Sequence, residues 1–300
     1  MSAVTFDELL NAGVHFGHLR RKWNPKMSPY IYSEKNGIHI INLHQTIEKL
    51  DEACAAAKQI ARSGKLILFI ATKKQARAII AEQAKRVGMP YVSERWPGGM
   101  LTNFATIRKA VKKMTGIEQL MNDKQFEALS KRERLQIQRE KDKLEKNLGS
   151  IADLQRLPSA VFIVDINKEH IAVDEARRLN LPIIAITDTN TNPELISFPI
   201  PGNDDASKSI EVIVGKITES IEEGLRERKV EKESHKDDED IENAKSEVDI
   251  DEEGEDVEVT DMEKRKKNTG DGGEGRRDRR PRRNSQGGGG KSGGNKPFRK

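Results

Sequence analysis

The chain has 300 residues, of which 34% are charged, 35% hydrophobic and only 4% aromatic, and this length suffices for one large domain or two small ones. The single cysteine, Cys54, excludes a disulfide framework and is typical of a protein in a reducing cytoplasm. No apolar stretch approaches the roughly 18 residues of a membrane helix, and the N-terminus MSAVTFDELL has no basic region before an apolar run, so we expect neither a membrane span nor a secretory signal.

Charge is divided unevenly along the chain. Residues 231–262 hold 16 acidic and 3 basic side chains, whereas residues 263–300 hold 14 basic and 4 acidic ones. These two segments cannot bury enough apolar surface to offset chain entropy, so both are predicted to be disordered. We therefore expect a mildly basic body over residues 1–228, an acidic segment over 229–262 and a basic Gly/Arg-rich tail over 263–300. A mildly basic body permits an RNA partner without requiring one.

Near the N-terminus, Tyr30–Ser33 and Ile38–Asn42 flank the sequence Glu34-Lys35-Asn36-Gly37. The Asn-Gly pair predicts a β-hairpin. The helix that follows, Gln45–Ala61, carries small and apolar residues on one face at spacings of three and four.

Short, uninterrupted apolar runs predict the central strands of a parallel sheet, because such runs are buried on both faces. A weaker run, Ile196–Ile200, is confined to an edge by the flanking Pro199 and Pro201. Amphipathic stretches alternate with the runs, which predicts a three-layer α/β sandwich around a mainly parallel sheet, as in Rossmann- and flavodoxin-like folds. The central strands are Leu66–Ala71, Ala160–Asp165 and Ile183–Asp188, and the helices that alternate with them are Gln75–Val87, Lys168–Leu179 and Ala206–Leu225.

A long insertion, Thr102–Gly149, interrupts this alternation. Its first half places Ile107, Ala110, Met114, Ile117 and Met121 at heptad spacing, and its second half, Lys124–Leu148, is mostly polar. Two helices joined near Asn122-Asp123 would form an antiparallel coiled-coil hairpin. Because the arm is too polar to lie in a core, we expect it to protrude.

The α/β pattern raises the possibility of a nucleotide-dependent enzyme. No GxGxxG opens a helix after any of the predicted strands and no GxxxxGK[ST] occurs, which counts against this class. The turn Thr72-Lys73-Lys74-Gln75 could hold a phosphate at a helix N-terminus, from RNA as readily as from a nucleotide. The alternative is a capped surface helix with solvated lysines.

Two groups of residues suggest a metal site. His15 and His18 could be half of a zinc site, but two further ligands are not evident, so packing or RNA hydrogen bonding is the better interpretation. Asp188, Asp204 and Asp205 follow two strands and could bind a divalent ion at the carboxyl edge of the sheet. We favour instead an Asx turn at Asp188 and a helix cap at Asp204 or Asp205, and we predict no metal, no cofactor and no catalytic residue.

Basic and aromatic residues gather in two loops, residues 20–26 and 94–100, each of which has a Trp beside a cation and Pro or Gly in the backbone. Cations neutralise phosphates and an exposed ring can stack on an unpaired base. Alternatively, each ring is an anchor in the core and the charges are solvated. The candidate RNA-binding residues are Arg20, Arg21, Lys22, Trp23, Lys26, Lys73, Lys74, Arg95, Trp96, Arg108, Lys109, Lys112 and Lys113.

At these loops the sequence resembles the ribosomal protein S2 family. The resemblance rests on GVHFGH, WNPKMSPYIY, NGIHIINL, SERWPGGMLTNF, the stretch Pro158–Pro182, ITDTNTNP and IPGNDDA, which occur in the family's order over about residues 3–228. It implies an α/β sandwich with a protruding hairpin, located on the solvent side of the small ribosomal subunit. It also implies that the 20–26 loop, Arg95–Trp96 and the basic arm face 16S ribosomal RNA.

The same resemblance implies partners and a location. Members help to dock the large mRNA-binding protein of the small subunit, and they act in the cytoplasm on no small-molecule substrate and at no membrane. The tail of about seventy residues departs from the family pattern, so the resemblance does not explain it. A protein–protein adaptor, using the hairpin for docking with RNA incidental, remains the alternative from another class.

Overall fold

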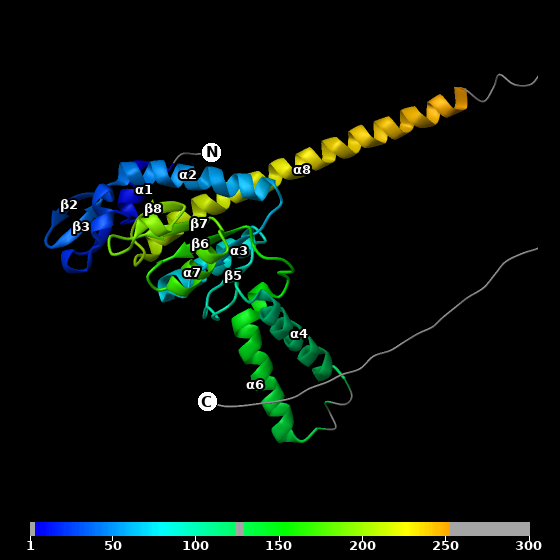
Figure 1. Cartoon of the computed structure of the whole chain (residues 1–300), viewed down its shortest axis with the longest axis horizontal. Helices are drawn as coiled ribbons and strands as arrows, with labels where there is room; N and C mark the ends of the chain where they lie inside the picture. The colour runs from blue at the N-terminus through cyan, green and yellow to red at the C-terminus, as the bar shows by residue number, and fades with distance from the viewer. Residues whose placement is uncertain (1–3, 124–125, 127–128, 253–300) are drawn as a thin grey trace, which may run out of the picture. The chain divides into compact units, whose positions relative to one another are not determined.

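Two sheets form the framework of the chain in the computed structural model (Figure 1). The structure describes residues 4–123, 126 and 129–252, with only the backbone for residues 234–252. A five-stranded parallel sheet has the order β5-β4-β6-β7-β8, and a three-stranded antiparallel sheet has the order β1-β3-β2. The predicted α/β class with a mainly parallel sheet is confirmed.

The parallel sheet has the strand order of flavodoxin-like folds, in which the second strand lies at one edge and the third pairs with the first. The four predicted strands are present, and β8 is the edge strand that its prolines indicate. Strand β5 has only two residues, too few for a sequence pattern. The strands are β4 (Ile67–Ile70), β5 (Tyr91–Val92), β6 (Ala160–Val164), β7 (Ile183–Thr187) and β8 (Phe198–Pro201).

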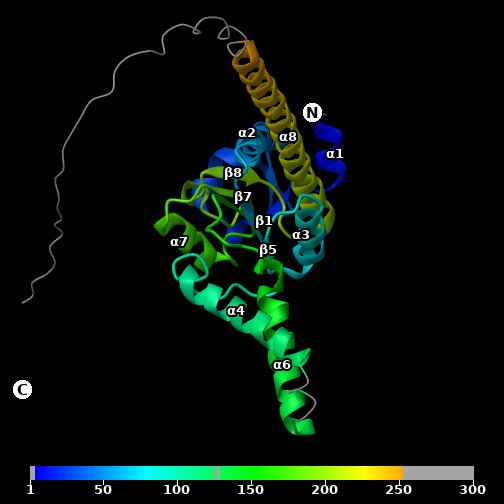
Figure 2. The ribbon, with the colours of Figure 1, turned by 90° about the vertical axis from the view of Figure 1, so that its right-hand side faces the viewer.

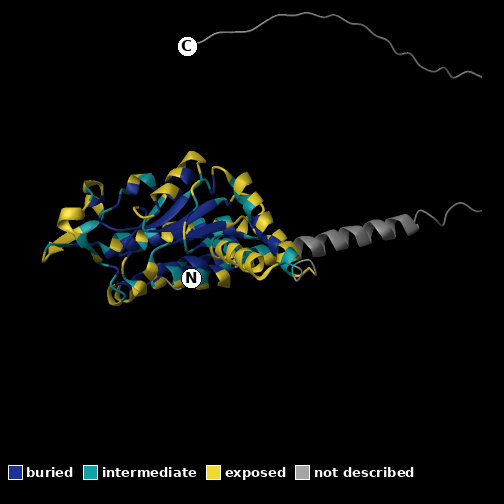
Figure 3. Ribbon diagram, turned by 90° about the horizontal axis from the view of Figure 1, so that it is seen from below, coloured by how far each residue is buried: buried dark blue, intermediate teal, exposed yellow. Residues whose placement is uncertain are grey.

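A hydrophobic core lies on each face of this sheet, because successive side chains of a strand point to opposite faces. Helices α2 (Leu43–Arg62), α3 (Lys74–Arg86) and the first part of α8 pack on one face, and α7 (His170–Arg178) packs on the other. Figure 2 shows α7 and α8 on opposite sides of β7 and β8. Figure 3 shows the strands buried between helices whose outer surfaces are exposed. The three predicted layers are therefore present.

The N-terminal region forms the small sheet. Helix α1 (Phe6–Asn11) precedes β1 (Phe16–Leu19), and the predicted hairpin consists of β2 (Ile31–Lys35) and β3 (Ile38–Ile41). Asn36 and Gly37 have φ angles of 52° and 74°, as a tight hairpin turn requires. Strand β1 was not predicted, because its pairing with β3 depends on residues twenty positions away. The 3-10 turns η1 (Arg20–Lys22) and η2 (Pro25–Tyr30) connect β1 to β2, and a further one, η4 (Pro193–Leu195), lies between β7 and β8.

The predicted insertion contains two helices, α4 (Phe104–Met121) and α6 (Lys131–Leu148), followed by the turn η3 (Gly149–Ile151). Helix α6 begins at residue 131 rather than 124, because Ser130 and Glu133 form a capping box there. The ion pairs Lys113–Glu140 and Lys141–Glu118 join the two helices. Residues 124–125 and 127–128, which connect them, lie outside the described residues, and a coiled coil along the whole arm stays a prediction.

Helix α8 spans Ser207–Glu252 and continues beyond Arg228, where the sequence predicts order to end. Residues 229–252 contain no Pro or Gly and are rich in Glu and Lys, which are good helix formers, so local propensity is the physical reason for the difference. The chain divides into two units, Met1–Ala244 and Lys245–Lys300. The basic segment 263–300 lies outside the described residues. Among the residues that are described, no helix is both long and apolar enough to cross a bilayer.

Candidate functional site

The first candidate loop, residues 20–26, is at the surface between β1 and β2. The side chains of Arg20, Arg21 and Lys22 are exposed on the turn η1. Nη1 of Arg20 lies 3.3 Å from Oε2 of Glu34, whereas Arg21 makes no ion pair with any described residue. The loop therefore presents cationic charge that the protein itself neutralises only in part.

Trp23 and Lys26 complete this loop. The Trp23 ring packs against the His39 ring, with centroids 5.1 Å apart, and 37% of the residue remains exposed. Lys26 is exposed and pairs with Glu194. Met27, which follows directly, is fully buried and anchors the loop to the body. One part of the Trp23 ring is therefore held in place while the rest is open to a partner.

The second candidate loop has the opposite arrangement, because the Trp96 ring is buried, with 7% exposure. Its Nε1 donates a hydrogen bond of 3.1 Å to Glu175, a buried residue of α7. The same carboxylate accepts hydrogen bonds from the backbone N–H groups of Gly99, Leu101 and Thr102, at 2.7, 2.9 and 3.1 Å. Trp96 is thus a core anchor, and in this structure its ring is not available to stack on a base.

The environment of Glu175 keeps it ionised. Burial alone would raise the pKa of the Glu175 carboxyl, but the hydrogen bonds from Thr102, Leu101, Trp96 and Gly99 outweigh burial and lower it. A carboxylate that accepts several N–H bonds is a stable buried charge. One ionised side chain therefore organises the loop from Trp96 to Thr102.

Arg95, the residue before Trp96, is exposed and makes no ion pair among the described residues. Its other neighbour, Glu94, accepts ion pairs from Arg77 and Lys146, with N–O distances of 3.3 and 3.5 Å. Within this loop the cation points to solvent while the tryptophan points inward.

The candidate cations of the arm divide into paired and unpaired residues. Nη1 of Arg108 donates to a backbone carbonyl of the body at 3.2 Å, and Lys113 pairs with Glu140 of α6 at 2.5 Å. Lys109 and Lys112 are exposed and make no ion pair among the described residues. Arg108 and Lys113 support the arm, and Lys109 and Lys112 are open to a partner.

The turn after β4 separates its two lysines. Lys73 Nζ lies 2.6 to 3.3 Å from carboxylate oxygens of Asp205, Asp204 and Asp165, so three acids already surround it. Lys74 is exposed and makes no ion pair among the described residues. Because acidic groups surround the start of α3, a phosphate bound by Lys73 would meet strong repulsion. Lys73 is therefore a structural residue, and of the two lysines in this turn only Lys74 has a charge that the described residues leave unpaired.

The carboxyl edge of the sheet also receives His18 from β1. Gly17 allows this approach, because a Cβ there would lie 2.6 Å from Cγ2 of Thr189. The backbone N–H of His18 donates a hydrogen bond of 2.8 Å to Oγ1 of Thr189. Nδ1 of His18 then lies 2.9 Å from Oδ2 of Asp188, and Nε2 lies 3.6 Å from Oδ2 of Asp205. We call His18, Lys73, Asp165, Asp188, Asp204 and Asp205 the carboxyl-edge cluster.

Charge interactions shift the pKa values in this cluster. Burial and the charges of Asp188 and Asp165 raise the pKa of Asp204 to about 7, against the opposite effect of Lys73. Burial would lower the pKa of Lys73, but the neighbouring carboxylates raise it overall. The hydrogen bond with Asp188 raises the pKa of His18. The cluster thus contains more buried acid than its single lysine neutralises.

The turn chemistry predicted for these aspartates belongs mainly to Asn203. Its Oδ1 accepts from the backbone N–H groups of Asp205 and Ala206, at 2.9 and 3.3 Å. Asp204 is fully buried with Oδ1 on Lys73. Asp188 lies in a backbone turn rather than the predicted Asx turn, since its carbonyl accepts from the N–H of Thr191 while its Oδ1 accepts from the N–H and Oγ1 of Thr189. The aspartate side chains at 204 and 205 therefore face the cluster and cap no helix.

Sequence reasoning missed several residues. Glu175 on α7 and Glu169 at the N-cap of that helix are buried acids, and Glu169 accepts from both the N–H and the Oγ1 of Thr72. A charged residue within the apolar periodicity of a helix was the available signal. Tyr32 on β2 is 76% exposed, and no sequence feature distinguished it from a core aromatic.

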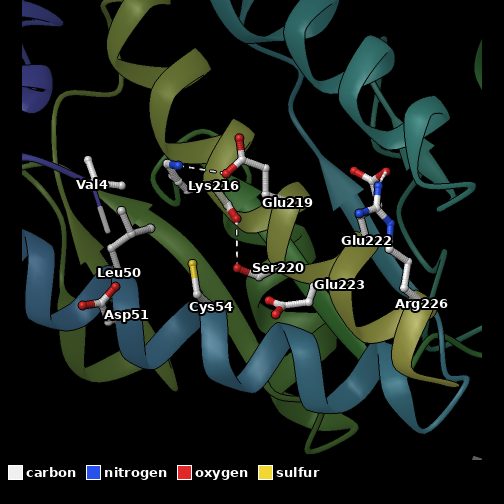
Figure 4. A pocket seen from close by; sticks show the side chains of 10 residues that line it. All are labelled: Val4, Leu50, Asp51, Cys54, Lys216, Glu219, Ser220, Glu222, Glu223 and Arg226. Atoms are coloured by element: carbon white, nitrogen blue, oxygen red, sulfur yellow. Dashed lines mark hydrogen bonds and ion pairs between the residues drawn. The ribbon is translucent and has the colours of Figure 1, made fainter. Parts of the chain in front are cut away.

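A cavity of about 500 Å³ lies between α2 and α8, and Cys54 is among the residues that line it (Figure 4). Burial raises the pKa of the Cys54 thiol, more than its hydrogen bond with Ser220 lowers it. Arg226 and Glu222 at the rim pair with each other at 2.9 Å. A thiol whose pKa burial raises stays protonated at neutral pH and is a poor nucleophile.

Comparison with known proteins gives a consistent family. The model of the family described as ribosomal protein S2 matches residues 9–224. A protein of Parabacteroides distasonis named small ribosomal subunit protein uS2 is 62% identical over 232 residues, which are 77% of this chain and 84% of that protein. Proteins of the same name from Porphyromonas gingivalis and Bacteroides fragilis are 64% and 63% identical, over 77% of this chain and 83% and 84% of theirs.

Proposed function

Because the chain belongs to the ribosomal protein S2 family, we propose that it is a structural constituent of the small ribosomal subunit that binds 16S ribosomal RNA and catalyses no reaction. The relatives carry the name of a small-subunit protein, which supports the structural role. Binding to RNA, support of subunit assembly and a cytoplasmic location extend this role beyond the relatives' names.

One observation carries the RNA-binding part of the proposal. Arg21, Lys74, Arg95, Lys109 and Lys112 are exposed and make no ion pair among the described residues, whereas the partly buried Lys73 is surrounded by acids. A cation that has no acidic partner within its own protein keeps its charge for phosphates, and phosphate contacts supply most of the affinity for folded nucleic acid.

Exposed aromatic rings would add base contacts to these phosphate contacts. Trp23 is fixed on one side by His39 and is 37% exposed, and Tyr32 on the neighbouring hairpin is 76% exposed. Rigid, partly exposed rings suit stacking on unpaired bases of structured RNA. The N-terminal sheet is therefore the part of the surface that we expect to recognise single-stranded RNA.

The arm would provide a second contact. The base of α4 and α6 is anchored by Val111 and Leu148, which belong to the core on the α7 face of the sheet. Because the end of the arm nearest the sheet is anchored, Lys109 and Lys112 are held in a fixed position from which they can contact phosphates of the RNA. We extend the proposal to a coiled-coil arm that also helps to dock neighbouring proteins, including the large mRNA-binding protein of the subunit.

The test is binding of the full chain to 16S ribosomal RNA between 50 and 200 mM salt. Six to ten phosphate contacts would lower the affinity by roughly 10³–10⁵ over this range. The double variant Arg21→Glu/Arg95→Glu should bind at least about tenfold more weakly. The control Lys65→Glu/Lys232→Glu changes the net charge equally at two exposed lysines outside these loops.

Equal affinity of the wild-type chain and the Arg21→Glu/Arg95→Glu variant, or binding that does not respond to salt, would exclude this RNA interface. Incorporation of the same variant into small subunits at the wild-type level would favour an adaptor that binds proteins. A high-salt wash of the subunits, followed by sedimentation, measures this incorporation.

A further inference from the structure

We propose that a pocket where the arm joins the body binds one unpaired nucleobase of the ribosomal RNA. This inference rests on the proposed function and names the element of the RNA that one part of the surface receives. The pocket has a volume of about 400 Å³, and its walls include the loop Arg95–Gly98, Ile107 and Ala110 of α4, and Leu144 and Leu148 of α6. We call it the arm-base pocket. Unstacked bases are the part of a folded RNA that proteins hold in such pockets.

The walls of the arm-base pocket are mostly apolar and are held in place by the core. Ile107, Ala110 and Leu144 pack against the core on the α7 face of the sheet but stay partly exposed. Trp96 and Leu148, which also line the pocket, are buried, and the hydrogen bond from Nε1 of Trp96 to Glu175 fixes the indole ring. A preformed apolar hollow gains free energy when an aromatic ring displaces its water. The Trp96 ring contributes a wall to this hollow and is no stacking platform.

Gly98 leaves one side of the pocket open. A Cβ atom at this position would meet no heavy atom within 4 Å, and Gly98 is exposed and does not have a positive φ. The loop therefore contributes backbone but no side chain at this point. A larger residue there would fill the pocket without a steric clash, which makes Gly98 a suitable position for a test.

Unpaired cations flank the pocket. Arg95 lines it, and Lys143 directly precedes Leu144 on α6. Both are exposed and make no ion pair among the described residues. A nucleotide has phosphates on both sides of its base and ribose, so an apolar pocket with a cation on either side matches one nucleotide of a single strand.

The acidic residues around the pocket are already engaged, so they do not cancel these cations. The carboxylates of Glu118 and Glu145 raise the pKa of Lys141, which lies on the same helix as Lys143. The other acids nearby have basic partners: Glu94 pairs with Arg77 and Lys146, and Glu140 pairs with Lys113. An anionic ligand therefore meets net positive charge at the arm-base pocket.

Asn147 adds a polar contact to the apolar walls. Its Nδ2 donates a hydrogen bond of 2.9 Å to the backbone carbonyl of Lys143, so the amide orientation is fixed and Oδ1 remains as an acceptor. No described residue donates a hydrogen bond to this oxygen. Each of the four bases has an N–H group on its pairing edge, which is free in an unpaired nucleotide. Asn147 can therefore orient a base in the pocket without selecting one of the four.

The experiment fills the pocket and measures the affinity of the full chain for 16S ribosomal RNA. Gly98→Leu should bind at least about fivefold more weakly, because one bound base contributes a factor of about 5 to 150. The dependence on salt should stay as in wild type, since no cation is removed. Ala110→Leu, which fills the pocket from α4, should have the same effect. The matched control is Gly215→Leu on α8, where a Cβ also meets no heavy atom within 4 Å, and it should bind as wild type.

Tryptophan fluorescence provides a second readout, which does not depend on 16S ribosomal RNA. The chain has two tryptophans, so in a Trp23→Phe background only Trp96 emits. Its emission should change on saturation with a short single-stranded oligoadenylate and should not change with a double-stranded RNA of equal length, whose bases are stacked and paired. Adding Gly98→Leu to this background should abolish the response while circular dichroism stays unchanged.

The outcomes separate this inference from the proposed function. Equal affinities of wild type and Gly98→Leu for 16S ribosomal RNA, with the steep salt dependence retained, would overturn the pocket and leave the proposed function standing. If the wild-type chain showed no salt-dependent binding, the proposed function would fail, and the response of Trp96 to oligoadenylate would still decide the pocket. Unchanged RNA affinity of Gly98→Leu together with loss of a neighbouring protein from assembled subunits would identify a protein as the occupant and would also overturn the inference.

Discussion

The two tryptophan loops, residues 20–26 and 94–100, share a short pattern and have opposite structures. Each has a tryptophan beside a basic residue and a proline one or two positions later. Trp23 is 37% exposed against His39, whereas Trp96 is 7% exposed and bonded to Glu175. The comparison teaches that composition identifies a loop built around an aromatic ring but does not tell to which side the ring turns.

The difference follows from what each loop meets in the fold. Glu175 on α7 offers a buried acceptor that the indole N–H and three backbone N–H groups need. No described acidic residue plays this part for Trp23, whose neighbours Arg21 and Lys22 stay exposed. A loop with an internal acceptor becomes part of the core, and a loop without one remains available to a partner.

The largest effect should come from Glu175→Ala, which removes the acceptor that only the second loop has. The indole N–H, three backbone N–H groups and the Thr102 hydroxyl would lose their acceptor, and we expect the free energy of unfolding to fall by about 3–5 kcal/mol. Urea unfolding measures the change. Asp174→Ala on the exposed side of the same helix is the control and should change stability by less than about 0.5 kcal/mol. A loss below about 1 kcal/mol for Glu175→Ala would show that another group supports the loop.

Trp23→Ala should affect binding more than stability. Loss of one stacked base would weaken the affinity for 16S ribosomal RNA by about 5- to 150-fold. Trp96→Phe keeps most of the buried ring and removes only the N–H donor, so it should lower stability and leave RNA affinity within about twofold of wild type. Filter binding compares the two variants, and the reverse order of affinities would contradict the assignment.

Acid should reveal the charge of Glu175. Its pKa in the folded chain lies below the ordinary value of 4.5, so its contribution to stability is complete above that pH. The contribution is lost as pH falls through the lower, folded pKa. The stability difference between wild type and Glu175→Gln should therefore be constant from pH 7 to 5 and shrink below about pH 4.5. A difference that grows on acidification would mean that Glu175 is buried as the neutral acid.

The smallest effect should be on salt dependence. Arg21→Gln removes one phosphate contact, so the slope of log affinity against log salt should decrease by about 0.7–0.9. Lys49→Gln changes the net charge equally at a residue that is already paired with Glu52, at 2.8 Å, and should leave the slope unchanged. Equal slopes for both variants would indicate a general charge effect rather than a contact at Arg21.

Much of the body could be predicted from the sequence. The apolar runs at β4, β6 and β7, the Asn36-Gly37 turn and the prolines of β8 act over a few residues, so the pattern contains the whole cause. Strands β1 and β5 could not be predicted, because their pairing partners come from distant segments. The candidate cations were found by residue type, but their division into paired and unpaired groups was not.

Local sequence pattern and tertiary structure determined different features of this protein. Local patterning determined the layers, the insertion and the position of the basic loops, because helix period, strand burial and turn chemistry depend on near neighbours. Only the tertiary structure decided that Lys73 would be surrounded by acids while Lys74 stays free, and that Trp96 would be buried while Trp23 is not. These outcomes depend on which distant carboxylate the fold brings within hydrogen-bond reach, and a single stretch of sequence does not contain that distance.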